Sequence, residues 1–98
     1  MDNYQYNIIE NSWIAKLAAL KLKSTSVAIV LGKKIYLHNT TRDEFLQDEK
    51  WLKHELCHIQ QFKRNGFTIF IFKYLLESIR KGYYNNKYEV EAREAEEL

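Results

Sequence analysis

The sequence predicts an α+β fold in a single domain, residues 1–98. Two short β-rich runs around a glycine predict a hairpin, and the segments before and after it carry apolar residues at helical spacing. A chain of 98 residues has no room for a second core, and this one has no proline and no repeat. The expected order is an N-terminal helix, a β-hairpin and three C-terminal helices.

The first helix is predicted over residues 11–23. Trp13, Leu17 and Leu20 follow one another at i, i+4 and i+7, which indicates an amphipathic helix with an apolar face. The run Ser24-Thr25-Ser26 ends it.

The hairpin is predicted from two apolar runs, residues 27–31 and 35–38. Gly32-Lys33-Lys34 separates them, and a glycine in so short a connection favours a tight turn.

The next helix is predicted over residues 42–64. Thr41 with Glu44 three residues later matches a capping box at its start, and Asn65-Gly66 matches a C-terminal cap. A break is expected near Gln47-Asp48.

Two more helices are expected, over residues 67–81 and 87–98, with a turn at 82–86. The first is expected to be largely buried, although its opening run 67–72 would also suit a strand. Its expected solvent face carries charged side chains at helical spacing: Lys73, Glu77, Arg80 and Lys81. The final helix is rich in glutamate.

Composition excludes several classes of protein. The formal net charge is only +2 and the basic pairs are scattered, so no nucleic-acid partner is expected. A single cysteine, Cys57, excludes an internal disulfide. Residues 1–6 do not resemble a secretory signal, and the apolar run 67–72 is too short to span a bilayer. We expect a soluble, cytoplasmic protein without stable membrane insertion.

The motif that carries chemistry is His54-Glu55-Leu56-Cys57-His58. Two histidines four residues apart lie on one face of a helix, where both imidazoles can reach one Zn²⁺. Glu55 then lies beside the open coordination position as a general base. Helical geometry places Trp51 and Phe62 on the metal face, and it places Cys57 on the solvent face.

A catalytic zinc of this kind needs a third protein ligand. The C-terminal segment supplies the candidates, because five glutamates fall within its last ten residues: Glu89, Glu91, Glu94, Glu96 and Glu97. Glu89 and Glu91 lie on opposite sides of a helix, so only one of them can face the metal. Glu89 is favoured because it shares its face with Ala92, a small residue suited to close helix packing.

The order of these motifs resembles that of the gluzincin-type metallopeptidases. The stretch Tyr88-Glu89-Val90-Glu91-Ala92-Arg93 is similar to their E-x-x-A-D segment, and Gln61 completes the H-E-x-x-H-x-x-Q pattern of minimal bacterial zincins. The resemblance covers residues 48–95 and implies a minimal zincin-like fold with Glu89 as the third ligand. Arg93 stands where the family has an aspartate, a departure that removes the expected partner of a ligand histidine.

A few other residues are candidates for supporting roles. Gln61 could orient a ligand histidine, and Tyr84 or Tyr88, with the neighbouring Tyr83, could donate a hydrogen bond to an oxyanion. Tyrosines in a turn more often pack and bond locally. His38 is a weaker metal candidate, at the end of a strand.

These features predict a zinc metallopeptidase that acts on a peptide or protein substrate. Either hairpin strand could pair with an extended peptide. One alternative is a catalytically silent zinc-binding interaction module, which the missing aspartate favours. A second is a membrane-surface protein that uses residues 67–72 and nearby lysines. The sequence predicts no oligomeric state.

Overall fold

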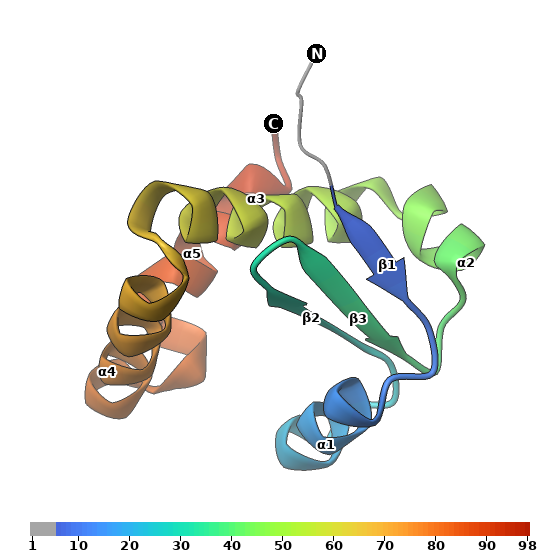
Figure 1. The fold of residues 1–98 in the computed structure, drawn as a ribbon, viewed down its shortest axis with the longest axis horizontal. Helices are drawn as coiled ribbons and strands as arrows, with labels where there is room; N and C mark the ends of the chain where they lie inside the picture. Colours follow the sequence, from blue (N-terminus) through green and yellow to red (C-terminus); the bar gives the residue numbers. More distant parts are fainter. Residues whose placement is uncertain (1–5) are drawn as a thin grey trace.

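The computed structural model describes residues 6–98 and has an α+β architecture of five helices and a three-stranded sheet within that range (Figure 1). The elements in chain order are β1 (Asn7–Ile9), α1 (Trp13–Leu22), β2 (Val27–Leu31), β3 (Lys34–His38), α2 (Arg42–Gln47), α3 (Glu49–Asn65), α4 (Phe67–Asn85) and α5 (Lys87–Ala95). Residues 1–5, on which part of the expectation about a secretory signal depends, lie outside the described residues.

The predicted hairpin is confirmed. β2 and β3 pair antiparallel, with Val30 opposite Ile35, and Gly32 turns the chain at a φ of 66° that favours glycine. β1 adds a parallel strand on the other side of β3, so the strand order is β1-β3-β2 and β2 is an edge strand. The sequence analysis predicts no strand there, because three residues are too few to display a two-residue period.

The two faces of the sheet are covered by different helices. Ile35 and Leu37 point into the main core, which includes residues of α2, α3, α4 and α5. Tyr36 and Val27 point to the opposite face and pack against alanines of α1. The sheet thus separates α1 from the layer that contains α3 and α5.

The first helix is confirmed, but the prediction of its buried face is wrong. Ala15 and Ala19 face the sheet, whereas Trp13 is 70% exposed and Leu17 and Leu20 are 56% and 68% exposed. The small alanines let the helix backbone approach the sheet closely, so the large side chains are left on the outer side.

The caps around the third helical region are confirmed. Thr41 and Glu44 form the capping box of α2, and the break falls at Asp48, whose side chain accepts the Trp51 N–H and caps α3. Gly66, with a φ of 85°, follows the last residue of α3.

The helix after it differs from the prediction in two ways. α4 runs to Asn85, past Lys81, but Gly82 has non-helical angles (φ 81°, ψ 166°), so the expected turn is a kink followed by a short helical segment. The expectation of a largely buried helix is wrong, because only Phe70 and Glu77 are buried in α4. Glu77, expected in solvent, accepts the Lys87 backbone N–H and pairs with Lys81.

The last helix is shorter than predicted. α5 ends at Ala95, and the residues after it form a turn rather than three more helical positions.

Candidate metal centre

Two histidines of α3 and one glutamate of α5 meet at a single point. The Nε2 atom of His54 lies 3.1 Å from Glu89 Oε1, and the Nε2 atom of His58 lies 3.2 Å from Glu89 Oε2. One ligand atom from each residue falls within 4.8 Å of the other two. The structure therefore brings together the three residues predicted as ligands, from segments 31 positions apart in the sequence.

Local packing explains how Glu89 reaches the two imidazoles. Asn86, fully buried, caps α5 by accepting the Tyr88 N–H, and its amide donates to the Tyr74 carbonyl and to Ser78 Oγ of α4. Ala92, one turn after Glu89, is also fully buried. A fixed helix start and a small residue at the contact let α5 lie close to α3.

Gln61 orients the ring of His58. The Gln61 amide nitrogen donates to the Tyr88 carbonyl at 3.0 Å and to Glu91 Oε1 at 2.7 Å, so the amide oxygen is the atom that faces His58 Nδ1 at 2.8 Å. An oxygen there accepts a hydrogen bond, so Nδ1 carries the hydrogen and donates it. The Nε2 atom of neutral His58 then carries a lone pair directed at Glu89, the tautomer needed to bind a metal.

Glu96 does the same for His54. Its Oε2 atom lies 2.8 Å from His54 Nδ1, so Nδ1 donates to the carboxylate and Nε2 faces Glu89. The expectation that Arg93 leaves a ligand histidine without a carboxylate partner is therefore wrong: Glu96 supplies the carboxylate from a later position. Arg93 points elsewhere, with its guanidinium 4.0 Å from the centre of the Tyr84 ring.

Glu55 lies beside the cluster in a largely buried position, with 6% of its surface exposed. Burial raises the pKa of its carboxyl to about 7, although the two histidines act in the opposite direction. A carboxyl with a pKa near neutrality can both accept and release a proton under ordinary conditions.

The charges in the cluster favour a cation. Burial alone would lower the pKa of His54, but hydrogen bonds to Glu89 and Glu96 and the charge of Glu55 raise it to about 9. Burial alone would also lower the pKa of His58, but hydrogen bonds to Glu89 and Gln61 and the charge of Glu55 raise it. Burial opposes the ionised form of Glu89, yet its hydrogen bonds to both histidines and Tyr74 hold its pKa well below the usual range.

Two tyrosines that the sequence analysis does not single out as the main candidates lie at the cluster. The Tyr74 hydroxyl donates to Glu89 Oε2 at 2.5 Å, and Tyr83 lines the adjoining cavity with Glu55. Tyr84 is 69% exposed and contacts Arg93, while the buried Tyr88 ring packs on Phe70. Tyr74 shares a helix face with Phe70 and Glu77, and that spacing was the signal available in the sequence.

A cavity of about 300 Å³ opens beside the cluster. Its polar wall holds the two histidines with Glu55 and Glu89, and its apolar wall is the edge strand, from Ala28 to Leu31. A second cavity shares His54, Glu55 and Ala28 with the first. Within residues 6–98 the outer edge of β2 pairs with no strand. The backbone of β2 is therefore unpaired on that edge.

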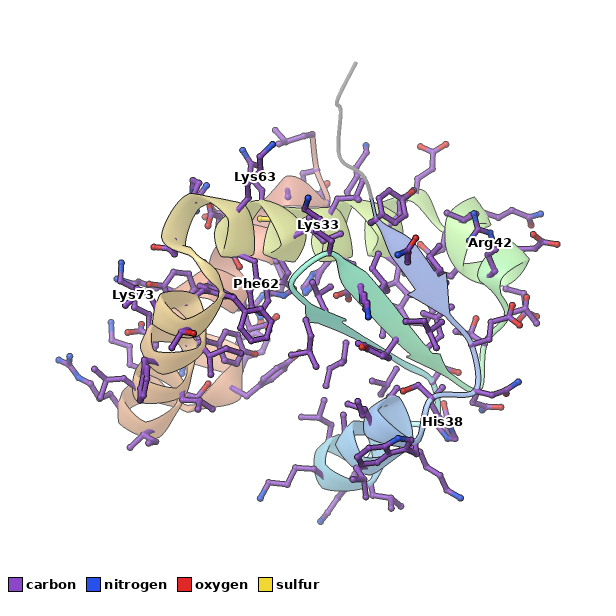
Figure 2. All side chains as sticks on the ribbon, viewed as in Figure 1. Lys33, His38, Arg42, Phe62, Lys63 and Lys73 are labelled. Atoms are coloured by element: carbon purple, nitrogen blue, oxygen red, sulfur yellow. The ribbon has the colours of Figure 1, made fainter. Side chains whose placement is uncertain are left out.

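Three other candidates lie away from the cluster. His38 is at the end of β3 beside α1, far from α3 (Figure 2), and Glu91 binds Gln61 and Arg64 instead of the histidines. Cys57 is partly exposed, and burial raises the pKa of its thiol to about 11, so the reactive thiolate is disfavoured.

Comparisons with protein-family models, with curated proteins and with solved structures found no match to this chain. The resemblance to gluzincins therefore depends on the sequence motifs alone. Among the described residues, no helix combines the length and the apolar character that crossing a bilayer requires.

Proposed function

We propose that this protein is a zinc-dependent metallopeptidase. His54, His58 and Glu89 would hold Zn²⁺, and Glu55 would act as the general base. The observation that carries the proposal is the convergence of both Nε2 atoms on the Glu89 carboxylate, with Glu55 buried beside them.

The chemistry of the donor atoms fits zinc. Two imidazole nitrogens and one carboxylate, with a further position open to a cavity, are the ligand set of catalytic zinc sites. Gln61 and Glu96 bind the opposite ring nitrogens, which leaves each Nε2 available for a metal. These hydrogen bonds to the Nδ1 atoms favour the interpretation that the two histidines form a metal site. They argue against the alternative that two surface histidines share a helix face by chance.

A bound zinc ion would supply Lewis acidity and lower the pKa of water at the open position. Glu55 Oε can take the proton of the attacking water and pass it to the amine that leaves. Tyr83 lines the same cavity, and its hydroxyl can donate a hydrogen bond to the oxygen of the scissile carbonyl, whereas the Tyr74 hydroxyl already donates to Glu89 Oε2.

The edge strand is the element best placed to hold a peptide. β3 lies between two strands and has no free edge, whereas β2 has one, and β2 lines both of the cavities that His54 lines. An extended peptide paired with β2 would run past Glu55 with its backbone amides within reach.

The test is Glu55→Gln, compared with the wild type for zinc content and for cleavage of a mixture of fluorogenic peptides. We expect zinc at one ion per chain in both proteins, and a loss of cleavage of about 100-fold or more in the variant. Glu94→Gln, an exposed change on α5, is the matched control and should leave cleavage unchanged.

Two outcomes would contradict the proposal. A wild type that takes up none of the divalent metals Mn, Fe, Co, Ni, Cu or Zn would remove the metal centre. A wild type that binds zinc and cleaves no peptide would favour the alternative, a catalytically silent zinc-binding interaction module.

A further inference from the structure

The outer sides of α1 and α4 expose large apolar side chains at helical spacing. On α1 these are Trp13, Leu17 and Leu20, all more than half exposed. On α4 the outward positions at the same kind of spacing are Ile69, Phe72, Leu76 and Ile79, of which Ile79 is 82% exposed. Exposed apolar surface of this extent on a small domain marks a surface that meets a partner.

The charges around these side chains all have one sign. Lys16 and Lys21 lie on the two sides of the apolar stripe of α1, and both are exposed. Along α4, Arg80 and Lys73 border the apolar side chains, and Figure 2 shows Lys73 projecting outward. α1 contains no acidic residue, and the one acidic residue of α4, Glu77, is buried.

Acidic residues are instead concentrated on the other helices. α2, α3 and α5 carry glutamates and aspartates of the candidate metal centre and of the helix caps; α3 lies across the sheet from α1 (Figure 1), whereas α5 packs against α4. These three helices also carry basic residues in equal number, seven acidic and seven basic between them, so what distinguishes α1 and α4 is that they expose basic side chains and no acidic one. We call the outer sides of α1 and α4, with these apolar and basic residues, the α1/α4 face.

We propose that the α1/α4 face binds the surface of an anionic lipid bilayer. Apolar side chains flanked by lysines are the pattern of helices that lie in the membrane interface: the apolar side chains enter the acyl boundary and the ammonium groups extend to the lipid phosphates. Trp13 suits this depth, because the indole ring is apolar while its N–H remains hydrogen-bonded.

The same charges argue against a second copy of the chain as the occupant. Two α1/α4 faces packed together would bring the Lys16, Lys21 and Arg80 side chains of both copies into one interface, and like charges at an interface disfavour association. A bilayer rich in anionic lipid offers opposite charge over both helices at once. Because no described helix can cross a bilayer, the attachment is peripheral.

Vesicle co-sedimentation tests the proposal. The protein is mixed with vesicles of equal parts phosphatidylglycerol and phosphatidylcholine, and separately with pure phosphatidylcholine vesicles. We expect binding to the anionic vesicles that weakens as salt is added, and little binding to the neutral ones. The double variant Leu17→Glu with Ile79→Glu should lose roughly tenfold or more per substitution in partitioning, since each removes one large apolar side chain from the lipid.

Leu98→Glu is the matched control, because Leu98 is 89% exposed but lies at the C-terminal end, outside the α1/α4 face. It should bind as the wild type does, and thermal unfolding should show all variants folded. The proposal is overturned if the wild type does not sediment with anionic vesicles, or if the double variant sediments as well as Leu98→Glu. It is also overturned if, without vesicles, the wild type forms a dimer that the double variant abolishes.

Discussion

The candidate metal centre and the α1/α4 face depart from ordinary protein packing in opposite directions. In the metal centre, ionisable side chains are buried: Glu89 is 3% exposed and His58 is 7% exposed. On the α1/α4 face, large apolar side chains such as Trp13 and Ile79 are in solvent. Each departure costs folding free energy unless something compensates for it.

The two regions differ in where the compensation comes from. In the metal centre it comes from within the chain, since Glu96, Gln61 and Tyr74 hydrogen-bond the buried groups and no fully buried side-chain polar atom among residues 6–98 lacks a partner. Nothing in the described chain covers the outer side of α1 or α4. A site for a small ion can thus be assembled by one chain, whereas an apolar face needs a larger partner.

The largest expected effect is the loss of zinc affinity when the proposed ligand from α5 is replaced. Glu89→Gln should lower zinc affinity by more than about 100-fold, because it removes a negatively charged ligand that both histidines face. Competition with a chromogenic chelator measures it. Glu91→Gln, two residues away, should bind zinc nearly as the wild type does. The opposite ranking would make Glu91 the third ligand.

A smaller loss is expected from the carboxylate behind His54. Glu96→Gln should weaken zinc binding by roughly 10- to 100-fold, because a neutral amide is a weaker acceptor for the His54 Nδ1–H than the carboxylate and makes Nε2 a less basic ligand. The same chelator competition applies. Arg93→Gln, at the position where gluzincins have an aspartate, should leave zinc affinity unchanged, and a loss there as large as that of Glu96→Gln would contradict the assignment.

The pH dependence of stability distinguishes the effect of bound protons from the effect of bound metal at the same site. In metal-free protein the pKa of His54 rises from 6.5 to about 9 on folding, so its contribution is complete below pH 6.5 and is lost as the pH rises through 9. Glu89 has a lowered pKa, so its contribution is present above pH 4.5 and is lost as the pH falls below that value. Glu55, with its raised pKa, adds a cost that grows above pH 4.5.

Metal-free protein should therefore be most stable between about pH 4.5 and 6.5, and should lose stability toward pH 9. Urea unfolding across this range measures it. Zinc should reverse the trend on the alkaline side, since zinc and protons compete for the same nitrogens. If the free energy of unfolding of the metal-free protein rose steadily from about pH 6 to about pH 9, that result would contradict these pKa shifts.

The smallest expected effect is on the free energy of unfolding, for substitutions on the exposed and the buried side of α1. Leu17→Ser should change the free energy of unfolding by no more than about 0.5 kcal/mol, because Leu17 is in solvent. Ala15→Leu should destabilise by about 1–3 kcal/mol, because Ala15 has no exposed surface and packs on the sheet. Chemical denaturation of both variants checks the orientation of the helix. A larger cost for Leu17→Ser than for Ala15→Leu would reverse it.

Local features of the sequence were enough to predict the parts of the fold that depend on local contacts. The capping box of Thr41, the glycine turn of the hairpin and the pairing of His54 with His58 on one helix face all follow from spacings of a few residues. Each needs no knowledge of what packs on the element. The choice of Glu89 over Glu91 also followed from helical geometry, aided by the small residue Ala92.

What could not be predicted depends on contacts between distant elements. The exposure of Trp13 is decided by the sheet, which accepts the alanine side of α1, and the role of Glu96 is decided by the angle at which α5 crosses α3. Tyr74 reaches Glu89 only because α4 and α5 are joined at the Gly82 kink and the Asn86 cap. Residue spacing carries no information on such crossings.

The Glu89 carboxylate, which faces imidazoles of α3 from its place on α5, also has a topological meaning. A metal bound there would be a cross-link that closes a loop of about thirty residues, and in polymer terms such a closure removes conformations chiefly from the unfolded chain. The loop so closed consists mainly of α4, the helix with few buried side chains of its own. Metal binding would therefore restrain both ends of α4, the helix that carries much of the α1/α4 face.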